Sequence, residues 1–457
     1  MIFTQYDSLY KTSVKIILPV LIFSGVLLFT FWSNPSLVPK LSPDSYGYWS
    51  VAKNFSTESS DSSIRPWLFP LFMRFCMVVF PVNWQIGISL IQIIIHSFII
   101  VLLFSLFKKY KLNNITCFIF SLIIGFNPTL QVYTSYVLAD LMLAVLTTLS
   151  WFYVLKINNE IEWNFNLIFI ASLLSALCIL TKLVGLLMIV PFLFSIYLVK
   201  GYSSSFLKIS IFMVLINYSL FFCWKGFQYY QNPNPKITKT SLITGAINWT
   251  AIKSGYVDYG VGSTLHDRLL DNGKIEKARS LKLNYSYTMD ESPDFVDVFK
   301  SVRGDMVLVN DQEFAKKVFQ AIPIKIFFLS MAKWHSFFTK RCFFPDRESF
   351  PGMPKIILNS YIKFYSYLYR PFLLIFLIFS AFFLFLNNYN NLLYTSFGLL
   401  AYASVVVTIG SGHAGEFIRY RVWVEYIMWF IALLPIGMTI EIILERFHYP
   451  TKESIEY

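Results

Sequence analysis

The polar residues with the chemistry of an active site are few, and they lie in four short segments of an otherwise apolar chain. The first segment, residues 41–73, contains both Asp44, in LSPDSYGYWSVA, and Arg65, in SIRPWLFP. Asp140 begins one apolar run, and Lys182 separates two others. The last segment, GSGHAGEFIRYR, contains His413, Glu416, Arg419 and Arg421. A carboxylate can accept the proton of a hydroxyl group, and an arginine can bind a phosphate through two parallel hydrogen bonds.

Asp44 has a structural interpretation as well as a chemical one. It ends the tripeptide Ser-Pro-Asp, a favourable helix start with serine as the cap, proline at the first position and an acidic residue near the positive end of the helix dipole. Such a start would direct the carboxylate outward, so the two interpretations are compatible. The aromatic residues that follow, Tyr46, Tyr48 and Trp49, fit either a membrane interface or a wall on which a sugar ring stacks.

The basic residues also have alternative interpretations. Arg65 precedes a proline and is therefore held extended, where it could pair with Asp44, bind a phosphate or anchor the loop at the membrane interface. Lys182 could contact a ligand or extend to lipid head groups. Arg419 and Arg421 lie two residues apart beside an apolar run, a placement that favours phosphate binding.

No metal, cofactor or nucleic acid is predicted as a ligand. His413 and Glu416 could bind a metal from one helix face, but they lack a third ligand, so a divalent metal is only a weak alternative. Four of the five cysteines lie in or beside apolar runs, without the spacing of a zinc site or a disulfide framework. The net charge of +12 arises from loops between apolar runs and forms no basic face for nucleic acid.

The composition indicates a membrane protein. The 457 residues are 56% hydrophobic, against roughly 45–50% in soluble domains. Apolar runs of about 20 residues recur, which is the length that a helix needs to cross a hydrocarbon core of ~30 Å. We therefore predict an all-α integral membrane protein with about ten transmembrane helices. They are expected near residues 14–32, 82–107, 115–129, 137–156, 167–180, 184–199, 206–224, 372–386, 392–409 and 423–444.

Flanking lysines predict the orientation. Lys11 and Lys15 precede the first run, and three lysines at 108, 109 and 111 follow the second, which places both of these ends in the cytoplasm. Both termini are then cytoplasmic, and the four polar segments share the outer face. The first run lacks a small-x-small cleavage site and is expected to be a retained anchor. The abundance of Asn, Ile, Lys and Phe suggests a bacterial plasma or inner membrane.

The same pattern divides the chain into three parts. Residues 1–224 form an N-terminal transmembrane module whose first external loop, 33–81, contains the candidate site, and residues 370–457 form a C-terminal module. Residues 225–369 are expected to be an external, α-rich insert. Two apolar stretches, 67–80 and 311–338, are expected to be interfacial helices, because the first is short and the second contains four lysines.

Five segments, taken in order, resemble the GT-C superfamily of integral-membrane glycosyltransferases, which use polyprenyl-phosphate-linked sugars. They are PDSYGYWSVA, RPWLFPLF, NPTLQVYTSYVLADLMLA, LTKLVGLLMIVP and EFIRYRVWVEYIMWFIALLPI. The superfamily includes protein O-mannosyltransferases, aminoarabinose transferases and lipopolysaccharide-modifying transferases. The resemblance implies that Asp44 is catalytic and that Lys182, Arg419 and Arg421 bind the donor phosphate. Further candidates for substrate binding are Arg65, Tyr48, Asp140, Glu416 and His413.

The resemblance also implies a reaction. Asp44 would act as general base in an inverting transfer of a hexosyl or pentosyl group to a hydroxyl of an extracytoplasmic glycan, lipid or protein, as in O-antigen modification of the cell envelope. A lipid phosphate is a good leaving group, so one carboxylate suffices where a glycosidase uses two. Many members have a paired acidic motif in this loop, whereas Ser45 follows Asp44 here, and this departure argues against a metal requirement.

Two alternatives remain open. A polysaccharide polymerase or ligase would use a diphosphate-linked glycan and would not require Asp44. A lipid-linked sugar transporter or flippase predicts charged residues along mid-membrane faces and often an inverted repeat. The predicted spans are nearly free of charge and show no such repeat, so the sequence favours an enzyme over a carrier.

Overall fold

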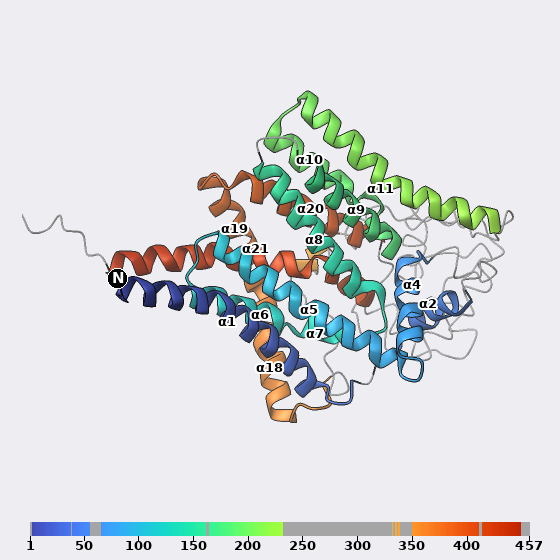
Figure 1. Cartoon of the computed structure of the whole chain (residues 1–457), viewed down its shortest axis with the longest axis horizontal. Coiled ribbons are helices and arrows are strands. Elements are labelled where there is room, and N and C mark those ends of the chain that lie inside the picture. The colour runs from blue at the N-terminus through green and yellow to red at the C-terminus, as the bar shows by residue number, and fades with distance from the viewer. Residues whose placement is uncertain are drawn as a thin grey trace, which may run out of the picture. The chain divides into compact units, whose positions relative to one another are not determined.

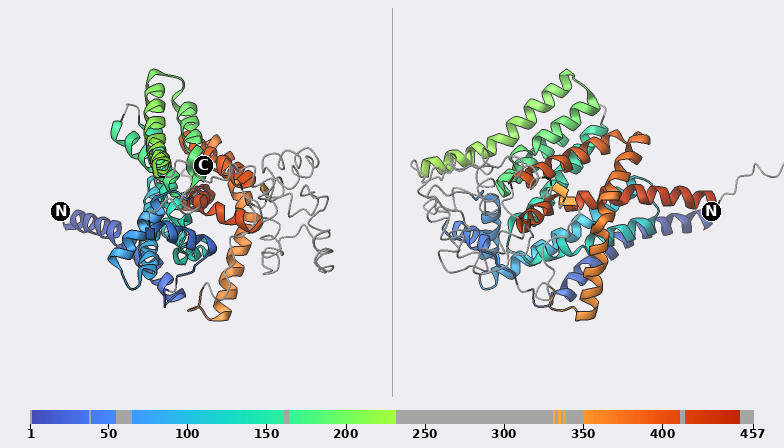
Figure 2. Two further views of the ribbon diagram at one scale, coloured as in Figure 1. Left: turned by 90° about the vertical axis from the view of Figure 1, so that its right-hand side faces the viewer. Right: turned by 180° about the vertical axis from the view of Figure 1, so that it is seen from behind.

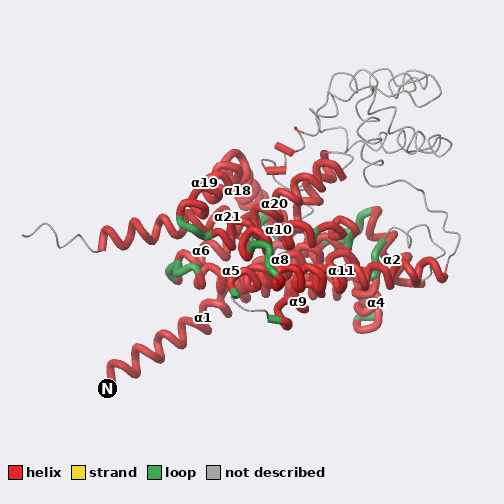
Figure 3. Tube along the Cα trace, turned by 90° about the horizontal axis from the view of Figure 1, so that it is seen from above, coloured by secondary structure: helices red, strands yellow, loops and turns green. Residues whose placement is uncertain are grey.

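The structure, a computed structural model, describes residues 2–37, 39–54, 65–160, 164–231, 331, 334–335, 337–338, 350–410 and 414–448. All regular structure in these residues is helical, apart from one isolated bridge between Lys40 and Tyr136 (Figure 3). This confirms the predicted all-α class. Most of the expected insert at 225–369, including most of its interfacial helix at 311–338, and His413 lie outside the described residues.

The chain forms two compact units. One comprises Met1–Asn234, Phe344–Ala401 and Val422–Tyr457, and the other comprises Pro235–Phe343 and Tyr402–Arg421. Nearly all described helices belong to the first unit, and the candidate site below is built from it.

The N-terminal half contains eleven helical segments among its described residues. They are α1 (Ile2–Ser33), α2 (Pro43–Asn54), α4 (Leu68–Val79), α5 (Trp84–Lys109), α6 (Asn114–Gly125), α7 (Pro128–Ser135), α8 (Ala139–Asn159), α9 (Phe165–Thr181), the 3-10 helix η1 (Leu183–Leu187), α10 (Ile189–Lys200) and α11 (Ser204–Gln231). Asparagine side chains at 113, 127 and 164 cap α6, α7 and α9 by accepting backbone amide hydrogens of the first turn.

The described residues of the C-terminal half form two long helices and a bent pair. They are α18 (Lys355–Tyr367), the π-helical segment η3 (Leu368–Phe372), α19 (Leu373–Leu386), α20 (Asn390–Gly410) and α21 (Ala414–His448). Arg370 within η3 has extended backbone angles, and Pro371 follows it, so the helix bends at this point. α18 lies within the residues that were expected to form the external insert.

Seven of the described helices are long and apolar enough to cross a membrane, or up to nine if each bent pair is one span. The bent pairs are α6 with α7, at 51°, and α18 with α19, at 45°. α9 has 17 residues, a length of about 25 Å, which is shorter than the hydrocarbon core. The multi-pass helical prediction is confirmed, while the count of about ten spans is not.

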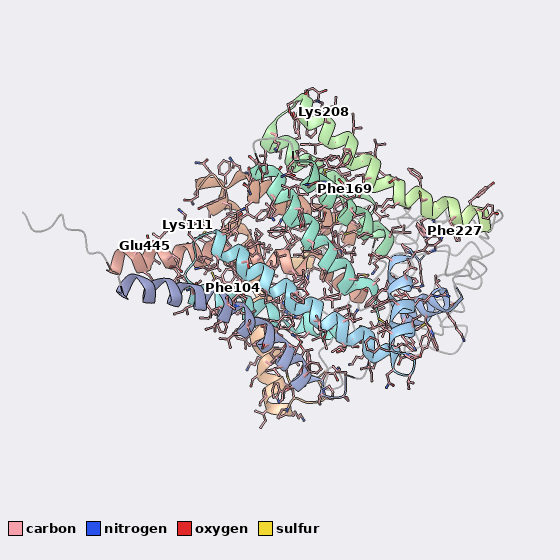
Figure 4. All side chains as sticks on the ribbon, in the orientation of Figure 1. Phe104, Lys111, Phe169, Lys208, Phe227 and Glu445 are labelled. Carbon is pink, nitrogen blue, oxygen red and sulfur yellow. The ribbon has the colours of Figure 1, made fainter. Side chains whose placement is uncertain are left out.

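Two groups of helices pack closely within the first unit. α9 lies between α8 and α11, and α5 packs against α1, α4 and α6 (Figures 1 and 2). α4 has only 12 residues and exposes Phe75 and Val78 while it buries Met73 and Cys76, as expected for an interfacial helix. Lys111 lies at one end of this unit, and Phe227 lies at the other, near α2 and α4 (Figure 4).

Candidate active site

Asp44 lies in the first turn of α2, as the sequence predicts, and it is paired with Arg65. The guanidinium Nη2 is 3.0 Å from Asp44 Oδ1, and the Asp44 side chain is 38% exposed. Two hydrogen bonds close the helix start: the amide of Ser42 donates to Ser45 Oγ, which caps that amide as in one half of a capping box, and the amide of Ser45 donates to the Ser42 carbonyl, both at 2.9 Å. The cap and the ion pair together fix the Asp44 carboxylate at an accessible helix end.

Gly47 makes room for the arginine. A Cβ atom built on Gly47 would lie 2.3 Å from Arg65 Nε, so any larger residue would displace the guanidinium group. Arg65 also lies over the Tyr48 ring, 4.6 Å from its centroid. Tyr48 itself is buried against Phe69. Of the aromatic residues in α2, Tyr46 is the exposed one, so it is better placed than Tyr48 to meet a sugar ring.

A short backbone contact joins the loop before α2 to the segment between α7 and α8. The Lys40 amide donates to the Ser135 carbonyl at 2.8 Å, and the Val137 amide donates to the Lys40 carbonyl at 3.0 Å. Ser45 Oγ donates to the Val137 carbonyl at 2.8 Å, and Ser45 is buried. The position that follows Asp44 is therefore used to attach α2 to this segment, which we call the 136–140 segment.

The 136–140 segment ends in a second ion pair. Asp140 lies in the first turn of α8, and its Oδ1 is 2.8 Å from Lys182 Nζ. Their side chains are only 4% and 15% exposed. Lys182 stands in extended conformation between α9 and η1, in a tight turn where a Cβ on Gly185 would lie 2.8 Å from the Cys178 backbone. The structure thus gives the predicted phosphate ligand a carboxylate partner.

The C-terminal candidates are described less fully. Arg421 is buried, and its Nη1 donates to the Phe337 carbonyl at 2.7 Å within the second unit. Glu416 and Arg419 lie in the first turns of α21, and their side chains, like all of His413, lie outside the described residues. Within the described residues, Ser45 and the 136–140 segment therefore connect the Asp44–Arg65 pair to the Asp140–Lys182 pair.

The described part of the chain contains no group of three or more His, Cys, Asp or Glu residues that could hold a metal ion. Cys76 is the cysteine nearest in sequence to Asp44, and burial raises the pKa of its thiol to about 11. It is therefore protonated at neutral pH and is a poor nucleophile.

The sequence analysis missed a set of buried polar residues inside the helices. His96, Tyr369 and Glu425 are each fully buried and hydrogen-bonded. Glu425 is an acidic residue in the apolar run of α21, and Tyr369 continues a four-residue tyrosine spacing from Tyr361. Both signals can be read from the sequence.

Comparison with known proteins gives a family match and distant structural likenesses, among them likenesses to two solved structures. The solved structures are of ArnT from Cupriavidus metallidurans, one bound to undecaprenyl phosphate and one in the apo state. Both are 12% identical over 92% of this chain, cover 77% and 76% of the ArnT chain, and have TM-scores of 0.38 and 0.36. No curated protein matches the sequence. Residues 72–234, which include Asp140 and Lys182, match the model of the dolichyl-phosphate-mannose-protein mannosyltransferases, a GT-C family, and this match confirms the GT-C resemblance for that part of the chain.

Proposed function

We propose that the chain is a membrane glycosyltransferase that moves a hexosyl or pentosyl group from a polyprenyl-phosphate donor to a hydroxyl group of an extracytoplasmic glycan, lipid or protein. The observation that carries this proposal is the attachment of the Asp44–Arg65 pair to the Asp140–Lys182 pair through Ser45 and the 136–140 segment. This attachment connects the accessible Asp44 carboxylate, at the start of α2, to the Lys182 cation, which pairs with Asp140 at the start of α8. The family match supports a lipid-phosphate donor.

Asp44 serves as the general base in this proposal. Its carboxylate takes the proton from the hydroxyl group of the acceptor substrate. The hydroxyl oxygen at the same time forms a bond to the anomeric carbon of the sugar, on the face opposite the phosphate. The bond from that carbon to the phosphate oxygen breaks, and the electron pair leaves with the polyprenyl phosphate, so the configuration inverts. Lys182, with Arg419 and Arg421 as further candidates, stabilises the charge of the departing phosphate.

The site is proposed to lie on the outer face of a bacterial inner membrane, with both termini in the cytoplasm. The lysine-rich turn after α5, which contains Lys111, lies at the end of α5 away from α2 and α4 (Figures 1 and 4). Lysines at short loops favour the cytoplasmic side, which leaves α2 on the outside.

Gly47→Ala is expected to lower the transfer rate at least about tenfold, because a misplaced catalytic group can cost much more than this. The new methyl group would displace the Arg65 side chain from Asp44, while alanine is about 1 kcal/mol better than glycine inside a helix. The fold should therefore persist. Initial rates and thermal unfolding in detergent measure the two effects separately.

The matched control for this change is Gly226→Ala in α11. A Cβ atom on Gly226 has no neighbour within 4 Å, so this variant should keep wild-type rates. Wild-type rates in Gly47→Ala as well would show that the ion pair with Arg65 is not needed for transfer.

The proposed activity is tested by incubating the purified protein with a panel of polyprenyl-phosphate sugars and an acceptor mixture. Mass spectrometry should show loss of one donor and release of polyprenyl phosphate. A polysaccharide polymerase or ligase would instead consume a diphosphate-linked glycan, and that activity would survive replacement of Asp44.

Two observations favour a carrier as a second candidate. Two bent helix pairs and the buried Glu425 are features that transporters use at their binding sites. The two functions differ in their product: a carrier in lipid vesicles would move the lipid-linked sugar across the bilayer intact. The transferase would cleave it on one side only.

A further inference from the structure

The two bent helix pairs meet at one buried polar cluster. α6 ends at Gly125, α7 begins at Pro128, and the side chain of Asn127 lies between them as the cap of α7. Tyr369 lies in η3, at the bend between α18 and α19, and its hydroxyl is 2.9 Å from Asn127 Nδ2. α18 also lies beside α6 (Figure 1). The two bends are therefore in direct contact through side chains.

The bend between α6 and α7 exposes backbone carbonyl groups, which is costly inside a membrane unless side chains satisfy them. Two tyrosines of α18 do so: Tyr361 donates to the Phe126 carbonyl at 2.5 Å, and Tyr365 donates to the Ile123 carbonyl at 2.7 Å. Residues four apart lie on one helix face, and Tyr369 continues this row beyond the end of α18.

Tyr369 differs from the other two tyrosines in its partners. Its hydroxyl donates to Oε1 of Glu425 in α21, which also accepts from Trp429 Nε1 at 2.8 Å. The same hydroxyl lies 2.9 Å from Asn127 Nδ2 and from Thr129 Oγ1. The hydroxyl is also 3.0 Å from Asn127 Oδ1, to which it could donate instead. A tyrosine hydroxyl has one proton, so donation to Glu425 excludes donation to Asn127 Oδ1 and makes Asn127 Nδ2 and Thr129 Oγ1 the donors to Tyr369. Glu425 thereby fixes the direction of the hydrogen bonds at the start of α7.

The start of α7 determines where the 136–140 segment lies. Asn127 Oδ1 caps α7 by accepting the Thr129 amide at 2.9 Å, and all eight residues of α7 are buried. Val137 is the second residue after α7. Its carbonyl accepts a hydrogen bond from the hydroxyl of Ser45, the residue next to Asp44. A short, fully packed helix thus joins the buried cluster to the candidate site.

We propose that Tyr369 and Glu425 form a positioning unit that fixes the direction of α7 and thereby places the 136–140 segment, Asp44 and Asp140 for the reaction. This inference rests on the proposed function. Both side chains are fully buried. Tyr369 hydrogen-bonds to Thr129 of α7 and to Glu425 of α21, so the pair acts through α7, and neither residue is catalytic.

Tyr369→Phe removes the hydroxyl and keeps the ring. We expect kcat to fall about tenfold to a hundredfold, the range that a displacement near 1 Å produces, with the donor KM within threefold of wild type. The matched control is Tyr365→Phe, which removes a hydroxyl one turn earlier whose partner carbonyl belongs to α6. If the tyrosines only stabilise the bundle, the two variants should lower the unfolding temperature alike and leave kcat unchanged.

A second readout does not depend on activity. Lys40 and Tyr136 pair in the isolated bridge, so cysteines at both positions should form a disulfide under mild oxidation. Cys223, which is exposed, and Cys342, which lies outside the described residues, are replaced by serine in this background so that neither can form another disulfide. Tyr369→Phe should slow disulfide formation severalfold, because the 136–140 segment shifts away from Lys40, whereas Tyr365→Phe should leave the rate unchanged.

The outcomes separate this inference from the proposed function. Equal kcat and equal disulfide rates for the two tyrosine variants would overturn the positioning unit, even if Asp44 proves essential. If Asp44 proves dispensable, the proposed base is wrong, and the disulfide rates still decide whether Tyr369 places the segment.

Discussion

Asp44→Asn is expected to abolish sugar transfer and to leave the protein folded. General-base catalysis contributes roughly 10²- to 10⁴-fold, and the asparagine amide cannot accept the hydroxyl proton. Asparagine can still accept a hydrogen bond from Arg65, and a partly exposed ion pair contributes only about 0–1 kcal/mol. The unfolding temperature should therefore change little. Turnover with saturating donor and acceptor, together with thermal unfolding, measures both.

The control for Asp44→Asn is Glu445→Gln. Glu445 is an exposed carboxylate near the C-terminal end of α21, at the opposite end of the first unit from α2 (Figure 4). It undergoes the same change from carboxylate to amide and should keep wild-type rates. Turnover close to wild type in Asp44→Asn would exclude this carboxylate as the base, whichever donor the enzyme uses.

The helices could be predicted because length and hydropathy decide them locally. The second span was expected at 82–107 and is α5, Trp84–Lys109. The start of α2 could be predicted because proline at the first position and serine before it act within one turn. The pairing of Arg65 with Asp44 was one of the alternatives that the sequence left open, and the structure selects it.

The bend between α6 and α7 was not predicted. A single span was expected at 115–129, because a hydropathy average does not detect a change in helix direction. Asn127 followed by Pro128 was the available signal, since asparagine caps a helix and proline begins one. α18 was missed for a different reason: its three tyrosines and two lysines lower the hydropathy, whereas the structure uses the tyrosine hydroxyls to hold α6.

Contacts between residues far apart in the chain could not be predicted from the sequence. The topology placed Asp140 and Lys182 on one side of the membrane, but nothing in their spacing pairs two side chains 42 residues apart. Nor could it show that Ser45 would hold the Val137 carbonyl. Hydropathy and flanking charges predict which side of the membrane a residue faces, while side-chain partners depend on how the helices pack.

Lys182→Gln is expected to lower both stability and use of the donor. Asp140 is almost fully buried, so removal of its lysine leaves a buried charge without that cation, a change that typically costs about 3–5 kcal/mol. If Lys182 also binds the donor phosphate, the donor KM should rise at least about tenfold, equivalent to 1.4 kcal/mol. The single variant cannot separate these effects, because a less stable protein also loses activity.

The double variant Lys182→Gln with Asp140→Asn separates them. Its two amides are neutral and similar in size to the original side chains, so most of the lost stability should return. The donor KM should remain raised, because the cation that meets the phosphate is still absent. Recovery of both the wild-type donor KM and the wild-type unfolding temperature in the double variant would show that Lys182 serves only to neutralise Asp140. Another residue would then bind the donor phosphate, and Arg419 is the next candidate.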